Sequence, residues 1–359
     1  MPIRVAVAGT GNAGRLVLRH VLSDPRFELT ALWVHSAGKV GVDAAAFAGL
    51  DGACGVVATS DWEAVLSARP ECVVYSAMAD NRVRQAIEDC RRLLAAGVNV
   101  VGTAPTPLVY PWGVVGERYL APLEAAALAG GVSIFVSGVD PGFTNDLIPL
   151  ALASTCRSVT QVRCVEIADY ATYDGATVMF DVMGFGAPLD QLPRLLSPGF
   201  LSRAWGPVVR QLAAGLAIDV GEITEWYERE PASEAFDIAA GHIPQFGLAG
   251  LRFEVRGLVG GRPALVIEHV TRLREDIRPD WRRPAQPGGS YRVEIVGEPS
   301  YTADICPTST DGDHNYAAIL AGVGRVVNAI PAVLAGPPGI RTTLDLPLVT
   351  RTDPPAGRE

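Results

Sequence analysis

The chain of 359 residues has almost no lysine, because Lys39 is the single lysine among 30 basic side chains. Any mechanism that needs a lysine amine must therefore use Lys39. The six cysteines are scattered, with no C-x-x-C pair and no metal spacing to a histidine, so we expect reduced thiols and no metal site. A basic block is also missing, and the formal charge of −9 argues against a nucleic-acid partner.

Signals for a membrane or for export are missing as well. No uninterrupted apolar run approaches the roughly 20 residues of a spanning helix. The N-terminus, MPIRVAVAGTG, enters a strand without a charged and then apolar leader. We therefore expect a cytoplasmic protein with no membrane partner. The length and the 48% of hydrophobic residues suffice for one large or two ordinary domains.

The first 140 residues alternate short apolar strands with amphipathic helices. Strands are expected at 3–9, 27–34, 55–60, 71–78, 98–103 and 132–139, and helices at about 12–22, 81–97 and 116–129. This alternation predicts a parallel sheet with crossover helices, which is a doubly wound α/β fold.

The pattern changes after residue 140. Alternating strands are expected at 160–171, at 291–297, and on both sides of a Gly-Gly turn in 251–273, with helical segments near 177–186 and 199–217. This predicts an α+β domain whose sheet leaves one face open. A mobile loop is expected at 278–289. A long apolar helix at 316–336 is expected to be buried between the domains.

We therefore divide the chain into a nucleotide-binding domain (1–140), a substrate and dimerisation domain (141–315) and a C-terminal helix and tail (316–359).

A dinucleotide site is predicted where the first strand meets the first helix, in GTGNAG. Gly9 permits the tight turn, Gly11 lets the backbone approach a pyrophosphate, and Gly14 lets helix and strand pack closely. The helix N-terminus offers free N–H groups to the phosphates. We assign to the cofactor site Gly9, Thr10, Gly11, Asn12, Ala13, Gly14, His35, Ser36, Lys39, Ala77, Met78 and Thr103.

The end of the second strand favours NADP, with NAD as the alternative. An acid here would hold the ribose 2′-hydroxyl of NAD, but none occurs before Asp43. Ser36 can donate a hydrogen bond to a 2′-phosphate, and Lys39 can supply a charge. The plainer alternative makes Lys39 a solvated loop residue.

The segment after the fifth strand, GTAPTPLVYPW (102–112), contains no acid, base or thiol. In an open α/β sheet it lies beside the nicotinamide. Its three prolines fix the backbone. We therefore expect it to form a rigid wall of the pocket, with Thr106, Leu108 and Tyr110 lining the substrate.

Candidate acid–base groups occur in the second domain. Glu166 and Tyr170 share a strand face in EIADYATYD, and Tyr173 follows at the turn. A tyrosine with a lowered pKa could serve as the acid, whereas a core aromatic pair is the alternative. His269 and Glu268 face opposite sides of a strand, so at most one reaches the pocket. A histidine of near-neutral pKa suits proton exchange, and a satisfied core histidine is the alternative.

Taken in order, several motifs resemble a known family: the GxGxxG domain, SGVDPGFTNDLIPL (137–150), EIADYATYDGATVMFDVMGFG (166–186), IEHVTRL (267–273), YRVEIVGEP (291–299) and VNAIPAVLAGPPGI (327–340). They resemble the dihydrodipicolinate-reductase-like group that contains 2,4-diaminopentanoate dehydrogenase and the native amine dehydrogenases. The resemblance implies a Rossmann domain, a substrate domain with an open mixed sheet, and a homodimer.

The same resemblance implies the NAD(P)H-dependent, reversible reduction of an imine formed from a carbonyl compound and ammonia. It implies pocket roles for Tyr170, Tyr173 and His269, which we take as candidate catalytic residues. Glu166 and Met179 are added to the pocket. One departure is clear: amine-forming members carry a glutamate after the fifth strand, whereas residues 104–108 here contain no acid.

We therefore expect an NADPH-dependent reductase of the C=N bond of a small, mostly apolar carbonyl or amine compound. Two alternatives stay open. One is an ammonia-independent reductase of ketones or aldehydes, and the other is a non-catalytic NADP-binding protein.

The assignment of Lys39 to a 2′-phosphate predicts the effect of Lys39→Ala. The Michaelis constant for NADPH should rise, because a charge on the phosphate is lost, whereas that for NADH should not change. Steady-state kinetics with both cofactors measure the two constants. If neither changes, Lys39 is a loop residue and the preference for NADP loses its support.

Overall fold

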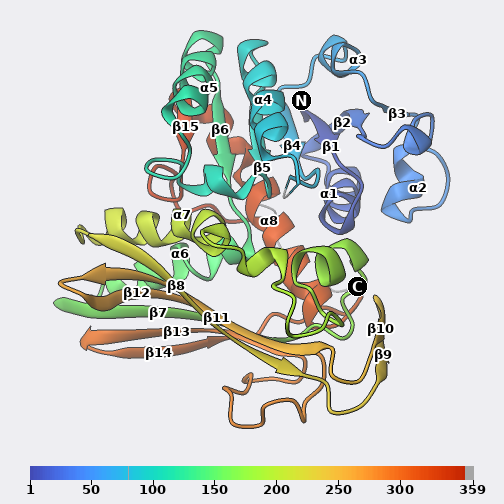
Figure 1. The fold of residues 1–359 in the computed structure, drawn as a ribbon. Coiled ribbons are helices and arrows are strands. Elements are labelled where there is room, and N and C mark those ends of the chain that lie inside the picture. The colour runs from blue at the N-terminus through green and yellow to red at the C-terminus, as the bar shows by residue number, and fades with distance from the viewer. Residues whose placement is uncertain (80, 352–359) are drawn as a thin grey trace, which may run out of the picture. The chain divides into compact units, whose positions relative to one another are not determined.

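The structure, a computed structural model, describes residues 1–79 and 81–351 and comprises two compact units (Figure 1). Unit 1 contains residues 1–109, 115–138 and those from 322 onward, and unit 2 contains residues 110–114 and 139–321. The domain boundaries drawn from the sequence stay predictions, and residues 352–359 of the third segment lie outside the described residues.

Unit 1 is built on a parallel seven-stranded sheet of order β15-β6-β5-β4-β1-β2-β3. Its strands are β1 (Ile3–Ala8), β2 (Phe27–Trp33), β3 (Ala58–Thr59), β4 (Cys72–Tyr75), β5 (Asn99–Gly102), β6 (Ser133–Val136) and β15 (Gly339–Arg341). Its helices are α1 (Asn12–Ser23), α2 (Ala44–Ala48), α3 (Trp62–Ser67), α4 (Val83–Ala95) and α5 (Glu117–Gly130), with short turns η1 (Ala37–Lys39) and η2 (Thr106–Val109).

The order of this sheet reverses at β1, which pairs with β2 on one side and β4 on the other. Its central strands are fully buried because the residues on both of their faces are apolar, as in CVVY of β4. The predicted doubly wound α/β fold is therefore confirmed. The carboxyl ends of β1 and β4 meet at the reversal, where such folds bind their ligands.

Unit 2 is built on a mixed six-stranded sheet of order β14-β13-β7-β12-β11-β8, in which only β7 and β12 are parallel. Its strands are β7 (Ser158–Asp169), β8 (Glu222–Pro231), β11 (Leu248–Val259), β12 (Arg262–Arg272), β13 (Gly289–Glu298) and β14 (Tyr301–Ile305), with a separate hairpin of β9 (Phe236–Ile238) and β10 (Gly241–Ile243). Helical segments are η3 (Val139–Phe143), α6 (Leu147–Ala153), η4 (Thr177–Val182), η5 (Arg194–Leu196), α7 (Phe200–Gly215) and the start of α8 (His314–Ala335).

One face of this sheet is covered by helices. Helix α7 packs on β8, β11 and β12, and α6 packs on β7 and β13 (Figure 1). The other face carries a charged network, in which Arg163 bridges the carboxylates of Glu254 and Glu268. The prediction of an α+β domain with an open mixed sheet is confirmed. Helices cover one face of the sheet, and a network of charged side chains lies on the other.

The segment 278–289, expected to be a mobile loop, is packed in the structure. Trp281 is buried with Val165, Ile167 and Val270, and the Arg272 guanidinium donates to the carbonyls of residues 277, 278 and 282. The buried Trp281 indole and the buried Arg272 guanidinium hold this segment in place, although its backbone has no regular structure. The prediction of a mobile loop was wrong because the many prolines and glycines of the segment are also typical of mobile loops.

Helix α8 is 22 residues long, and its length and composition would allow it to cross a membrane. From the sequence we interpreted this stretch as a long, buried apolar helix. Within the structure 56% of its most apolar window is buried, as is common for core helices. Its predicted place between the domains stays a prediction.

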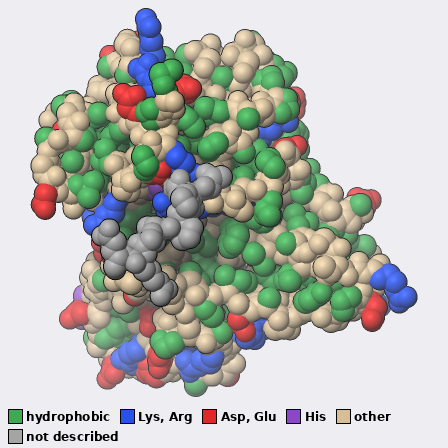
Figure 2. Space-filling view, turned by 180° about the vertical axis from the view of Figure 1, so that it is seen from behind, with side chains coloured by type: hydrophobic (Ala, Val, Ile, Leu, Met, Phe, Trp, Pro, Cys, Tyr) green, Lys and Arg blue, Asp and Glu red, His purple; other side chains and the backbone are tan. Residues whose placement is uncertain are grey.

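Charged side chains of both signs are mixed on one face of the molecule. On the face shown in Figure 2, Lys and Arg side chains are scattered among Asp and Glu and form no continuous basic area. This distribution agrees with the absence of a basic block in the sequence.

The glycines of GTGNAG make a testable contrast. A Cβ added to Gly14 would lie 2.3 Å from the Gly9 carbonyl oxygen, whereas one added to Gly11 would meet nothing within 4 Å. Gly14→Ala should therefore destabilise unit 1 by about 1–3 kcal/mol, the usual cost of overpacking. Gly11→Ala should leave the folding stability nearly unchanged. Denaturant unfolding of both variants measures this, and equal losses would contradict the packing argument.

Candidate active site

The glycine turn of unit 1 has the form of a phosphate cradle. Gly9 takes a φ of +109°, which favours glycine, and its N–H donates to the Trp33 carbonyl at 2.9 Å. Gly11 precedes α1 with no side-chain cap, so the first N–H groups of this helix lack that partner. Open space at Gly11 and an uncapped helix N-terminus fit a pyrophosphate group.

The structure brings Lys39 to the same turn, since its Nζ donates to the Thr10 hydroxyl at 2.9 Å. Ser36 and His35 are exposed beside it. Asp43, the nearest acid along the chain, accepts backbone N–H groups from residues 45, 54 and 55, which lowers the pKa of its carboxyl. Asp43 is thereby engaged in local structure.

The other cofactor candidates of unit 1 lie at the ends of β4 and β5. Ala77 is buried and Met78 is 46% exposed. Thr103 and Thr106 are half-buried, whereas Leu108 is buried and belongs to the core of unit 1. Leu108 is therefore shielded from solvent within unit 1. Its predicted place in the lining of the substrate pocket stays a prediction.

Tyr110 belongs to unit 2, where its ring lies 5.0 Å from that of Trp112 in an edge-on arrangement. The acid-free stretch 102–112 thus divides between the two units.

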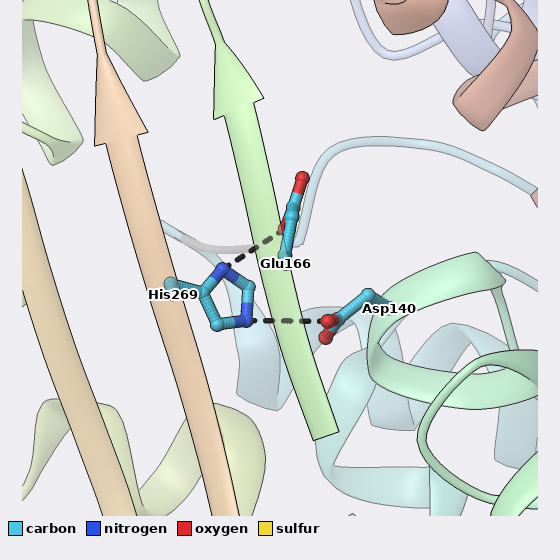
Figure 3. A group of neighbouring side chains, drawn as sticks. All are labelled: Asp140, Glu166 and His269. Atoms are coloured by element: carbon cyan, nitrogen blue, oxygen red, sulfur yellow. Dashed lines mark ion pairs between the residues drawn. The ribbon is translucent and has the colours of Figure 1, made fainter. Parts of the chain in front are cut away.

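The strongest candidate site is a buried cluster of Asp140, Glu166 and His269 in unit 2 (Figure 3). The register of β12 against β7 sets His269 beside Glu166 on the helix-covered face. Nδ1 of His269 lies 2.9 Å from Glu166 Oε2, and Nε2 lies 3.3 Å from Asp140 Oδ2. The three side chains are 4–8% exposed, so water screens their charges little.

This environment sets the charge of the imidazole. Burial opposes protonation, but the carboxylates of Asp140 and Glu166 outweigh it and raise the pKa of His269 from 6.5 to about 10. The near-neutral histidine expected from the sequence is therefore corrected to an imidazolium. Two carboxylates thus flank this imidazolium.

The two contacts of the imidazolium differ. The Nδ1 contact with Glu166 is short, whereas Nε2 has an ion-pair distance to Asp140 but no hydrogen-bond geometry with any described residue. The Nε2 proton is therefore the more loosely held of the two.

Two aromatic residues that were not predicted fix this imidazole. The Phe253 ring stacks on it at 4.6 Å and 10°, and the Trp205 ring meets it edge-on at 4.6 Å. Trp205 Nε1 also donates to Asp140 Oδ1 at 2.8 Å. Asp140, which precedes a proline, is thus held as a hydrogen-bond acceptor. Only the three-dimensional fold brings these residues to His269.

The predicted tyrosines lie next to the cluster. Tyr170 donates to Glu166 Oε1 at 2.9 Å, and its ring stacks on Tyr173 at 5.8 Å. Burial, followed by the charge of Glu166, raises the pKa of Tyr170 well above its usual value. Tyr170 is therefore a neutral hydrogen-bond donor, and the expected lowering of its pKa is wrong. Met179 is fully buried.

The three ligand atoms of the cluster lie within 4.8 Å of one another, close enough for a metal ion. However, the two ring nitrogens of His269 face different carboxylates, and an imidazole presents only one nitrogen to a given ion. The geometry favours an ion-paired imidazolium.

Aspartates lie at two helix starts. The Asp146 side chain caps α6. Asp313 accepts from the Tyr316 N–H at the start of α8, whereas the His314 ring is buried against Tyr291.

Comparisons with known proteins point to one family. A model of the C-terminal domain of 2,4-diaminopentanoate dehydrogenase matches residues 143–353. An amine dehydrogenase from Streptomyces virginiae is 39% identical over 350 residues, which cover 96% of each chain. The 2,4-diaminopentanoate dehydrogenase of Acetoanaerobium sticklandii is 23% identical over 282 residues, 75% of this chain and 72% of that protein.

Solved structures agree on the fold. An amine dehydrogenase from Mycobacterium smegmatis superposes with a TM-score of 0.79 at 22% identity, covering 98% of each chain. GenD2, from gentamicin A biosynthesis, was solved with NAD and superposes with a TM-score of 0.55 at 17% identity, covering 96% of this chain and 90% of that chain.

The charge of His269 predicts a pH-dependent stability difference from His269→Asn. Because the folded-state pKa is raised, the stabilisation is complete below pH 6.5 and is lost as the pH rises through about 10. The variant should be less stable by about 3–5 kcal/mol near pH 6.5, since two buried carboxylates lose their cation.

Denaturant unfolding over this pH range measures the difference, which should shrink toward pH 10. His242, an exposed histidine paired with Asp237, provides the control variant His242→Asn. A difference that stays constant would show that His269 is not charged in the folded state.

Proposed function

The chain belongs to the family of 2,4-diaminopentanoate dehydrogenase and the amine dehydrogenases, and we propose that it is an NADP-dependent amine dehydrogenase acting on a small, mostly apolar amine or carbonyl compound. Membership makes it an NAD(P)-dependent oxidoreductase, and this prediction is confirmed. Its relatives are named for amine substrates, which supports the reaction class proposed here.

The observation that carries the proposal is the buried Asp140–His269–Glu166 cluster. Its two carboxylates attract a cationic amine. The raised pKa of His269 keeps the imidazole protonated, so that it can donate a proton as a general acid.

In this proposal His269 supplies the protons that the acid-free segment 104–108 cannot. In the direction of amine formation its Nε2–H protonates the hydroxyl of the carbinolamine, which leaves as water. In the opposite direction the neutral imidazole takes that proton back. Glu166 and Asp140 hold the imidazolium, and the Tyr170 hydroxyl keeps one Glu166 oxygen engaged.

The cofactor would bind in unit 1. Gly9, Gly11 and the start of α1 would hold the pyrophosphate, and Lys39 with Ser36 would hold the 2′-phosphate of NADP. The nicotinamide supplies or accepts the hydride when bound. The roles of Ala77, Met78 and Thr103 beside it, the cytoplasmic location and the homodimer stay predictions.

A second candidate is an ammonia-independent carbonyl reductase. It is favoured by one observation, the absence of an acid in residues 104–108, where the resemblance implies a glutamate. The same His269 could then protonate a carbonyl oxygen directly.

Dependence on ammonium separates the two candidates. NADPH oxidation with a panel of small ketones and aldehydes should require ammonium, and its rate should saturate with ammonium concentration. A rate independent of ammonium would overturn the amine assignment and support carbonyl reduction. NADPH binding without turnover of any compound would support the non-catalytic alternative.

Glu166→Gln tests the cluster in the same assay. Replacing the carboxylate with an amide removes half of the negative charge that raises the pKa of His269, so kcat should fall by roughly 10²-fold or more. Glu294→Gln is the matched control, since Glu294 lies on the opposite sheet face and pairs with Arg282. If both variants keep wild-type kcat, the cluster takes no part in catalysis.

A further inference from the structure

Unit 2 contains a second charged cavity, of about 400 Å³, on the sheet face away from the cluster. Its walls include Arg272, Arg274, Arg283, Asp169 and Glu275. In the pairing of β12 with β7, Arg272 lies opposite Asp169, just as His269 lies opposite Glu166. Arg272 and Asp169 each follow the corresponding cluster residue by three positions. An odd separation along a strand places side chains on opposite faces. The cavity is thus separate from the proposed catalytic cluster and independent of the proposed function.

Arg272 is a buried cation without a carboxylate partner. It is 4% exposed, and its Nε and Nη2 donate to the carbonyls of Ile277 at 3.0 Å and Arg282 at 2.8 Å. Among the described residues it forms no ion pair, and no hydrogen bond is made by its Nη1. Carbonyl groups satisfy N–H donors but carry no net charge. The Trp281 ring, whose centroid lies 5.7 Å from the guanidinium carbon, adds a cation–π contact, but the cost of burying the charge is still only partly offset.

Neighbouring charges act on Arg272 in both directions, since Arg283 lowers its pKa whereas Asp280 and Asp169 raise it. Burial, and then the positive charge of Arg283, lower the pKa of Arg272 from 12.5 to about 10. Arg274, by contrast, is paired with Asp276 and Glu234. Arg283 is exposed and, within the described ranges 1–79 and 81–351, donates only to the Glu275 backbone carbonyl, at 2.7 Å.

The two acids of the cavity wall limit the charge of a ligand. Asp169 and Glu275 form no ion pair with Arg272 or Arg283 in the described part of the chain, but they would repel an anion. A dianion such as phosphate would meet this repulsion twice over. The balance of charges favours a single negative charge spread over two oxygens.

We propose that this cavity binds the carboxylate group of a small monoanion. One oxygen accepts from Arg272 Nη1, and the other accepts from the Arg283 guanidinium, which is long and exposed enough to reach it. Charge-assisted hydrogen bonds of this kind are the strong ones, and both arginines gain the counter-charge that they lack.

Acetate is the probe, added to the full chain without nicotinamide cofactor and compared with chloride at equal ionic strength. Isothermal titration should show saturable acetate binding, and thermal unfolding should shift upward with it. Arg283→Gln should weaken binding by roughly tenfold or more, because one charged hydrogen bond is lost. Arg262→Gln, at the exposed β11–β12 turn, changes the net charge equally and should bind acetate as the wild type does.

Arg272→Lys keeps the charge but loses the fork of the guanidinium, and it should also bind more weakly. Its melting temperature in chloride reports separately on the lost carbonyl contacts. Acetate binding that does not saturate, equal affinity in wild type and Arg283→Gln, or binding of phosphate without acetate would each overturn the proposal. No turnover is measured, so a failed amine assay leaves this test intact.

Discussion

The structure of unit 2 depends on one electrostatic constraint, the placing of a histidine between two buried carboxylates. Two such carboxylates cannot both stay ionised in a medium of low polarity unless a cation lies between them. The imidazolium of His269 is that cation. The parallel pairing of β7 and β12, the Phe253 ring and the Trp205 indole all hold it in this position.

Much of the fold could be predicted from the sequence, because apolar periodicity and glycine placement determine it locally. Strand β8 escaped prediction for a physical reason: its side chains are polar on both faces, and Glu225 accepts N–H groups from the start of α7. Strands β9 and β10 have three residues each, too few to show a period. A strand that is exposed, that carries paired charged side chains or that has only three residues shows no period of apolar residues from which it could be predicted.

The candidate site was predictable only in part. Glu166 and Tyr170 could be named because strand alternation puts them on one face, and His269 because of the family resemblance. An aspartate before proline, such as Asp140, is more typical of a turn. Trp205 could not be named, since a tryptophan in an amphipathic helix resembles a core residue. The charge of His269 depends on side chains more than a hundred residues away, and no local pattern encodes it.

The near absence of lysine has a chemical consequence if the proposed reaction with carbonyl compounds holds. A lysine amine condenses with aldehydes and ketones to give Schiff bases, whereas an arginine guanidinium stays protonated at every physiological pH. In this chain a carbonyl compound can modify one lysine side chain, that of Lys39. Its amine donates a hydrogen bond to the Thr10 hydroxyl in the glycine turn of unit 1. Because the other basic side chains are arginines, no further side-chain amine is present to form a Schiff base with a carbonyl compound.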